Sequence, residues 1–190
     1  MNQIRSVVYG MSLFLAIAIL IFSAGPERTY FFGFGAYGLL VLSLIPGGVY
    51  ALFPNGAGRV PFQKAKKAFG ISSFFFATAY ACLGWRSRLF TSEGIPAWAF
   101  FAGAVALLLL AILTVTSVKA IKHRMRPWWK PLHRSVYVAG GLAAAHIYGL
   151  MLDLQVAHGW RTLFWLLIGG LTFIQFIRFV RFLCSAPSKE

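Results

Sequence analysis

Two histidines lie in an apolar part of the chain, where an ionisable side chain is costly and usually has a function. His133 and His146 are thirteen residues apart. On one continuous helix this spacing places them about 20 Å apart along the axis and about 140° apart around it, so they do not share one small metal ion. Neutral imidazole is a common axial ligand of haem iron. The spacing therefore favours two separate bound groups, one held by each histidine near an end of a membrane-spanning helix.

Small residues accompany these histidines, because residues 139–145 are all alanine or glycine except Leu142. They leave room beside the helix for a large planar cofactor. They also permit close helix packing with each histidine hydrogen-bonded to a neighbour, so this second interpretation stays open. His123 and His158 fall in expected loops, and we interpret both as solvated.

Uncharged stretches define the elements that must position these side chains. Each is compared with the roughly 20 apolar residues that span a bilayer. Runs of this length without alternating polar residues favour helices over a β-barrel. We expect an all-α integral membrane protein, a single domain over residues 1–190 that forms a bundle of six transmembrane helices. The expected helices cover about residues 6–25, 30–53, 68–85, 95–117, 132–152 and 160–181.

The composition excludes a soluble globule. The chain is 59% hydrophobic and only 12% charged, whereas soluble domains carry about 25% charged residues. A net charge of +14 would suggest nucleic acid as the partner of a soluble protein. In so apolar a chain it indicates a lipid bilayer instead, and we expect no nucleic-acid partner.

The distribution of Lys and Arg predicts the orientation. With six helices, fourteen of the 18 Lys and Arg residues fall on the side that holds both termini, so both termini are expected to be cytoplasmic. The first apolar run is longer than that of a signal peptide, and we expect it to be retained as a helix.

A basic cytoplasmic surface results from this bias. Attraction to anionic lipid, about 1 kcal/mol for each basic residue, is one explanation. A docking surface for an acidic cytosolic partner, such as a flavoprotein, is the other. The residues of this surface are Lys66, Lys67, Lys122, Arg124, Arg126, Lys130 and Arg134.

Two motifs resemble a known family. The first runs from Thr116 and Ser117 through the basic loop to Trp129–Arg134 and is followed by Tyr137 and His146, and the second is Lys66–Gly70. Both are similar to the ferric reductase-like transmembrane domain. The resemblance is closest to its short bacterial branch, the haem-b membrane subunits of periplasmic methionine sulfoxide reductase systems. It implies six helices and b haems held by histidines of the third and fifth helices in the bacterial inner membrane. It also implies that His133 is a ligand of a cytoplasmic-side haem and His146 of an outer-side haem.

Tyr80 departs from the family pattern, because it stands where the third helix should present its histidine, ten residues after Gly70. Three arrangements stay open. His146 holds a haem alone or together with Tyr80, since tyrosinate is a known haem ligand. Alternatively, His133 holds a haem with a ligand outside the third helix, or one or both haems are lost. The ordinary interpretation of Tyr80 is a buried phenol hydrogen-bonded through its hydroxyl.

These observations lead to one main hypothesis. We expect a haem-b-binding subunit, with one or two haems, that carries electrons from a cytosolic flavin or quinol donor to an outer-face acceptor. The G-x-G-x-x-G spacing at Gly33–Gly38 lies inside an apolar run of span length rather than between a strand and a helix, so we expect no soluble redox domain. FMN or quinone would then act on the donor side, and other proteins would deliver and collect electrons. We expect an electron-transfer subunit rather than a stand-alone enzyme. The alternative is a haem-free relative that serves as an accessory subunit of a larger membrane complex.

Overall fold

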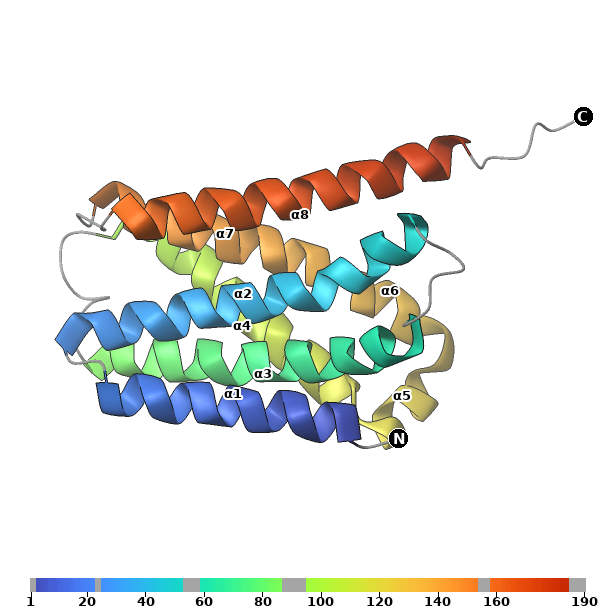
Figure 1. Cartoon of the computed structure of the whole chain (residues 1–190), viewed down its shortest axis with the longest axis horizontal. Coiled ribbons are helices and arrows are strands. Elements are labelled where there is room, and N and C mark those ends of the chain that lie inside the picture. Colours follow the sequence, from blue (N-terminus) through green and yellow to red (C-terminus); the bar gives the residue numbers. More distant parts are fainter. Residues whose placement is uncertain (1–2, 23–24, 53–58, 87–94, 154–157, 185–190) are drawn as a thin grey trace, which may run out of the picture.

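The computed structural model describes residues 3–22, 25–52, 59–86, 95–153 and 158–184, and within these ranges the chain is entirely helical with short turns (Figure 1). The all-α class is thus as predicted. Six long helices are α1 (Gln3–Phe22), α2 (Gly25–Leu52), α3 (Arg59–Arg86), α4 (Ala97–Thr116), α7 (Val136–Asp153) and α8 (His158–Cys184). Three short ones, α5 (Lys119–Met125), η1 (Arg126–Trp128) and α6 (Trp129–Arg134), connect α4 to α7.

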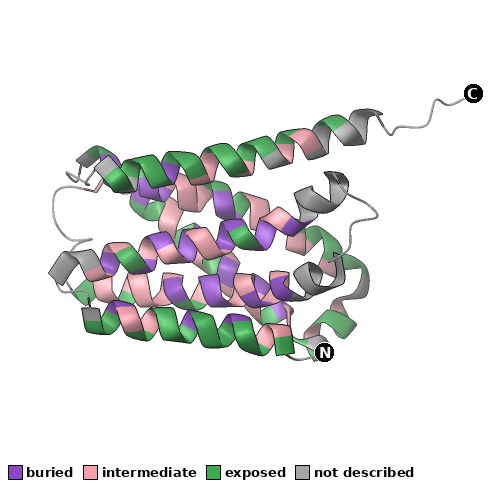
Figure 2. Cartoon of the chain, viewed as in Figure 1, coloured by how far each residue is buried: buried purple, intermediate pink, exposed green. Residues whose placement is uncertain are grey.

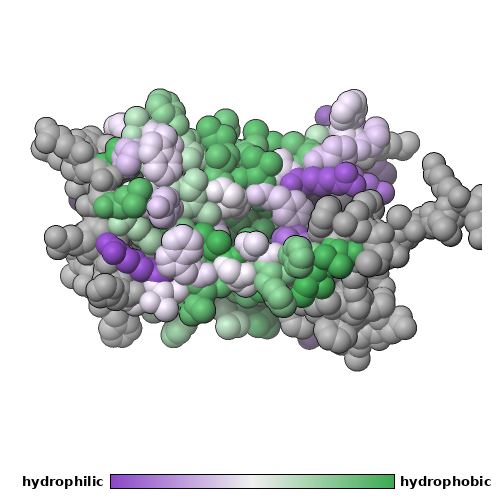
Figure 3. Space-filling model, turned by 90° about the horizontal axis from the view of Figure 1, so that it is seen from above, coloured by the Kyte–Doolittle hydropathy of each residue, from purple (hydrophilic) through white to green (hydrophobic). Residues whose placement is uncertain are grey.

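The helices have the length and apolarity of membrane spans. Five stretches of 19 to 24 residues meet both criteria, and the shorter apolar stretch Arg161–Ile177 lies in α8. Figure 3 shows hydrophobic side chains across the middle of the molecule and hydrophilic ones toward its two ends. The protein is therefore a multi-pass helical membrane protein in composition and shape. The count of six spans and the cytoplasmic position of both termini stay predictions.

Helix α2 lies at the centre of the bundle. It packs most extensively against α3 and also contacts α8, α1 and α7, while α4 packs along α7. The first turn of α1 and the last turn of α8 lie at the same end of the bundle, where α5 and α6 are also found (Figure 1). This end, which carries the basic residues of α5 and α6, is called the basic end below.

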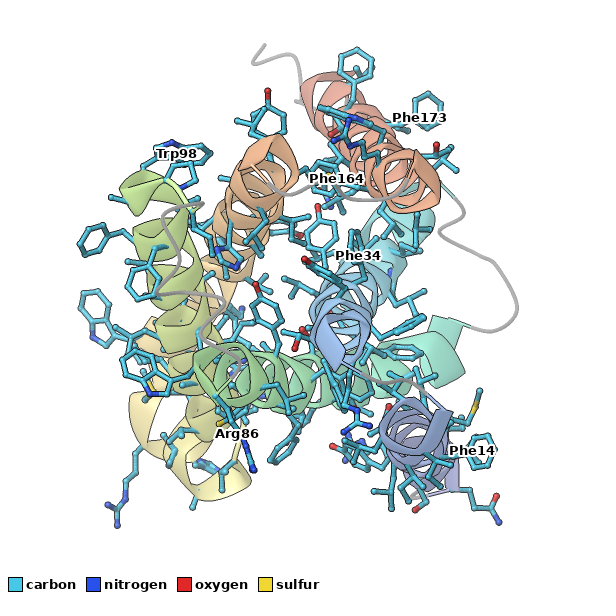
Figure 4. The ribbon with its side chains drawn as sticks, turned by 90° about the vertical axis from the view of Figure 1, so that its left-hand side faces the viewer. Phe14, Phe34, Arg86, Trp98, Phe164 and Phe173 are labelled. Carbon is cyan, nitrogen blue, oxygen red and sulfur yellow. The ribbon has the colours of Figure 1, made fainter. Side chains whose placement is uncertain are left out.

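Side-chain burial separates an inner from an outer face on each helix (Figure 2). Phe164 of α8 is fully buried against Tyr37 and Phe34 of α2, whereas Phe14 of α1 and Phe173 of α8 point away from the bundle (Figure 4). Because lipid tails are as apolar as these outer side chains, helix association in a membrane depends on close packing. The cluster around Phe164 holds α8 against α2.

The expected helix over 132–152 is divided in two by the structure. Ser135 separates α6 from α7, and both its amide and its hydroxyl donate to the carbonyl of Leu132, at 3.0 and 2.7 Å. Such bonds to the residue three positions back tighten the helix locally. His133 and His146 therefore lie on two consecutive helices, so the angle calculated for one continuous helix does not apply.

Candidate functional site

His146 is held in the bundle by both nitrogens of its ring. The side chain is buried, and its Nδ1 lies 2.8 Å from the backbone carbonyl oxygen of Ala99 in α4. A carbonyl only accepts, so Nδ1 carries the hydrogen, and Nε2 of the neutral ring is left as an acceptor. The hydroxyl of Tyr80 in α3 lies 3.0 Å from Nε2 and donates to it. The structure thus brings together two of the residues singled out from the sequence.

Glycines on the neighbouring helices make room for these two rings. A Cβ on Gly103 of α4 would lie 2.6 Å from Nδ1 of His146, and one on Gly33 of α2 would lie 3.0 Å from the Tyr80 ring. Both distances are shorter than ordinary contacts of a Cβ atom, so a larger residue at either position would force a neighbouring group to move. Gly103 and Gly33 therefore fix how closely α4 approaches α7 and α2 approaches α3 at the site.

An apolar cavity opens beside the pair. Its volume is about 260 Å³, and helices α2, α3, α4 and α7 all contribute to its lining. Small side chains are frequent in the lining, and none of the described residues that line it is Lys, Arg, Asp or Glu. His146, Tyr80 and Ser73 are among the few polar lining groups, and the hydroxyl of Ser73 already donates to the carbonyl of Ala36 at 2.8 Å. An apolar pocket with a few converging polar groups is typical of a cofactor site.

The chemistry of this donor set fits haem iron. Histidines that bind metals usually donate their second ring N–H to a carbonyl or carboxylate, which fixes the tautomer and the ring orientation, as Ala99 does for His146. No group of three or more His, Cys, Asp or Glu residues that could hold a metal ion occurs in the described ranges. A single imidazole facing an apolar cavity suits a metal that brings its other ligands with it, as a porphyrin does.

The distance between His146 and Tyr80 limits what they do together. A metal bound to both needs about 2 Å on each side, hence about 4 Å between the two ligand atoms. Nε2 and the hydroxyl oxygen are 3.0 Å apart. Tyr80 in the described position is a hydrogen-bond partner of His146. Iron bound to Nε2, with or without Tyr80 as a second ligand, requires the two side chains to separate, by about 1 Å for joint ligation and by more for His146 alone.

His133 has different surroundings at the basic end. Its Nε2 lies 3.3 Å from the Ser117 hydroxyl, and the Trp129 ring stacks on it with centroids 4.3 Å apart. Lys67 of α3 donates to the carbonyl of Ser117, and the Lys122 ammonium lies 4.1 Å from the centre of the Trp129 ring. His133 lines neither the cavity at His146 nor a second groove of about 520 Å³ between α2, α7 and α8.

The remaining residues of the predicted basic surface lie on three helices at this end. Lys122, Arg124, Lys130 and Arg134 are exposed on α5 and α6, while Lys66 and Lys67 are half-buried at the start of α3. The Arg126 side chain lies outside the described residues. His123 is exposed, as its interpretation as a solvated residue requires, and nothing is described of the His158 side chain.

Sequence reasoning missed the contributions of four residues to the two sites. Ala99 acts through its backbone carbonyl, which no side-chain pattern reveals. Gly103 was detectable, because Ala99 and Gly103 are four residues apart and small residues at this spacing mark close helix contacts. Ser117 and Trp129 belong to the stretch that carries the resemblance, but their contacts with His133 depend on how α5 and η1 connect α4 to α6.

The fold and the site define a class: a multi-helix membrane protein with an anchored imidazole facing an apolar cofactor-type cavity. The chain is similar to the protein-methionine-sulfoxide reductase heme-binding subunit MsrQ of Pasteurella multocida (strain Pm70), at 30% identity over 126 residues. This similarity confirms the MsrQ-like relationship that the sequence motifs predicted. It covers 63% of this chain, and the chain spans 59% of the length of that relative. No protein-family model matches the chain.

Proposed function

We propose that the chain is a haem-binding subunit that carries electrons across the bacterial inner membrane. The observation that carries the proposal is His146, whose Nδ1–H is anchored on the Ala99 carbonyl and whose side chain lines an apolar cavity beside Tyr80. The similarity to a protein named as a heme-binding subunit supports the same assignment. A b haem bound here would supply a one-electron carrier inside the membrane.

The residues of the site have distinct roles in this proposal. His146 would hold the haem iron through Nε2, and the Ala99 carbonyl fixes the ring in the tautomer that leaves Nε2 without a hydrogen. The apolar lining excludes water and lowers the local dielectric constant, which tunes the reduction potential of a bound haem. His133 as the ligand of a second haem, on the cytoplasmic side, stays a prediction.

Electrons would enter at the basic end and leave at the other. The proposed donor is a cytosolic flavin or a quinol, with FMN or quinone acting on the donor side. The proposed acceptor is an outer-face redox partner within a protein-methionine-sulfoxide reductase system, which the name of the relative suggests.

A reduced-minus-oxidised optical spectrum of the full chain, purified after haem-replete expression, tests the proposal. We expect the Soret and α bands of a b haem. In the His133→Ala variant, a spectrum that keeps all of its intensity would assign the pigment to His146 alone, and loss of a distinct fraction would assign a second haem to His133. A colourless wild-type protein would contradict the proposed function.

The basic end is proposed to bind anionic lipid at the cytoplasmic surface. Lys122 and Arg124 are exposed on α5, close to the membrane-spanning helices. Each basic residue near an anionic surface contributes about 1 kcal/mol. Replacing both with glutamine should therefore weaken binding of detergent-solubilised protein to vesicles rich in phosphatidylglycerol by about 30-fold at low salt.

The matched control is Arg161→Gln, because Arg161 is exposed at the opposite end of the bundle, near the start of α8. Vesicle flotation over a series of salt concentrations measures the effect. Equal binding of the double variant and the control would refute lipid attraction and leave an acidic cytosolic protein as the partner of this surface.

A haem-free accessory subunit is the second candidate function. One observation favours it: Tyr80 and Ala99 satisfy both ring nitrogens of His146 from within the chain. Copurification in a fixed ratio with a larger membrane complex, without pigment belonging to this chain, would support this function over the cytochrome.

A further inference from the structure

Three lysine side chains lie near the His133 imidazole at the basic end. Lys66 and Lys67 come from α3 and Lys122 from α5, and each is close enough for its charge to act on the ring. Lys66 and Lys67 are half-buried, while Lys122 is exposed. Three cations from two helices thus converge at one place.

The part of the chain that the structure describes has no carboxylate at this place. Of the four Asp and Glu residues, two fall in the described ranges: Glu27 in the first turn of α2 and Asp153 as the last residue of α7. Both positions are at the end of the bundle opposite the basic end (Figure 1). Neighbouring like charges repel, and an anion between them is attracted by all of them. The charge of the cluster therefore fits an anionic ligand.

Two of the three ammonium groups are held in place by contacts within the protein. Lys67 donates to the backbone carbonyl of Ser117. The Lys122 ammonium lies 4.1 Å from the centre of the Trp129 ring, and this ring stacks on His133. A free lysine side chain loses much rotamer freedom when it binds a ligand. Ammonium groups that are already positioned lower this cost, so the cluster is better prepared for a ligand than ordinary surface lysines are.

The cluster lies at the depth of lipid headgroups. Three apolar stretches of span length, in α3, α4 and α6–α7, begin or end at it. Lys66 and Lys67 are in the first turn of the α3 stretch. Ser117 directly follows the α4 stretch, and Trp129 begins the third. Tryptophan is typical of the membrane–water interface. The anions found at this depth are the phosphates of phospholipids, whereas the carboxylates of a cytosolic protein would approach from the water beyond it.

We propose that this cluster is a binding site for the headgroup of an anionic phospholipid, and that it prefers cardiolipin, whose two phosphates can each meet an ammonium group. Basic pockets between transmembrane helices are known to bind such headgroups. The inference rests on the proposed lipid binding of the basic end, and names its site and its lipid. It differs from diffuse attraction, to which every basic residue of this end would contribute alike.

A titration of the full chain with cardiolipin in a neutral detergent, with bound lipid counted by native mass spectrometry, tests the site. Ammonium acetate at about 0.5 M suppresses diffuse attraction, because the Debye length is then only about 4 Å. We expect one cardiolipin per chain, and about tenfold weaker binding of phosphatidylglycerol, which has one phosphate. The double variant Lys67→Gln, Lys122→Gln should raise the cardiolipin dissociation constant about 100-fold, because charge-assisted hydrogen bonds to both phosphates are lost.

The matched control is the double variant Lys130→Gln, Arg134→Gln, which removes the same charge from exposed positions of α6. At this salt concentration it should change the dissociation constant by less than about threefold. Thermal unfolding in the same detergent identifies a variant that fails to fold. The two single variants at Lys67 and Lys122 then replace the double variant, and each should weaken cardiolipin binding about tenfold.

Three results would overturn the inference. Equal weakening by the site variant and the control refutes the site and leaves the diffuse lipid attraction of the proposed function intact. Inorganic phosphate that displaces cardiolipin at equal concentration assigns the cluster to a soluble anion. Folded wild-type protein that binds no cardiolipin also refutes the site, and if it fails to bind anionic vesicles as well, the proposed lipid binding of the basic end is refuted with it.

Discussion

Replacing His146 with alanine should abolish the haem binding proposed for this site. The change deletes the imidazole that lines the cavity and whose Nδ1–H is anchored on the Ala99 carbonyl. Loss of a group that merely orients a metal ligand costs 10- to 100-fold in affinity, so loss of the ligand itself should lower haem affinity by about 100-fold or more. Haem titration of the detergent-solubilised variant, followed at the Soret band, measures this.

The matched control for this prediction is His123→Ala. His123 is exposed on α5 and does not line the cavity, so its variant should bind haem like the wild type. Unchanged haem affinity in His146→Ala, with the helical content preserved, would show that the ligand is misassigned.

Replacing Gly149 with alanine should destabilise the bundle and disturb the site from a distance. A Cβ on Gly149 of α7 would overlap the Cβ of Ala99 and lie 3.0 Å from Cη2 of Trp98. Because Ala99 is fully buried and a Cβ cannot rotate away, the two helices must separate. Overpacking of this kind costs about 1–3 kcal/mol, and the shift also moves the carbonyl that anchors His146. We expect a lower free energy of unfolding and weaker haem binding.

Gly141→Ala is the control on the same helix, because a Cβ at Gly141 meets nothing within 4 Å. Alanine is favoured over glycine in a helix by about 0.5–1 kcal/mol, so this variant should be as stable as the wild type or more so. Thermal unfolding in one detergent compares the two. Equal stability of Gly149→Ala and Gly141→Ala would contradict the packing of α4 against α7.

The long helices were predictable because charge marks their ends. Residues such as Arg5, Arg28 and Arg86 bound apolar runs of span length, and a charged side chain inside a lipid-facing helix is too costly to leave unpaired. Between α4 and α7 this signal fails, because Lys and Arg recur at short intervals over residues 119–134 and leave no uncharged run there. The structure forms α5, η1 and α6 there. These short helices lie at the basic end, where charged side chains are tolerated.

The site was predictable only in part. His146 stood out because its side chain is ionisable in an apolar run, and Tyr80 because it departs from a family pattern. Their hydrogen bond depends on how α3 lies against α7, and that distance is set by contacts spread over several helices. The Ala99 carbonyl belongs to the backbone, which every residue has, so no sequence pattern distinguishes it. The division at Ser135 likewise depends on a local hydrogen bond that serine makes in some helices and not in others.

The central claim is that the imidazole of His146 holds the iron of a b haem. The most direct measurement is the molar ratio of haem to polypeptide in pure protein from haem-replete cells, determined by a pyridine haemochrome assay with quantitative amino-acid analysis. We expect at least one b haem per chain, and a second if His133 is also a ligand. A ratio near zero in folded protein would contradict it.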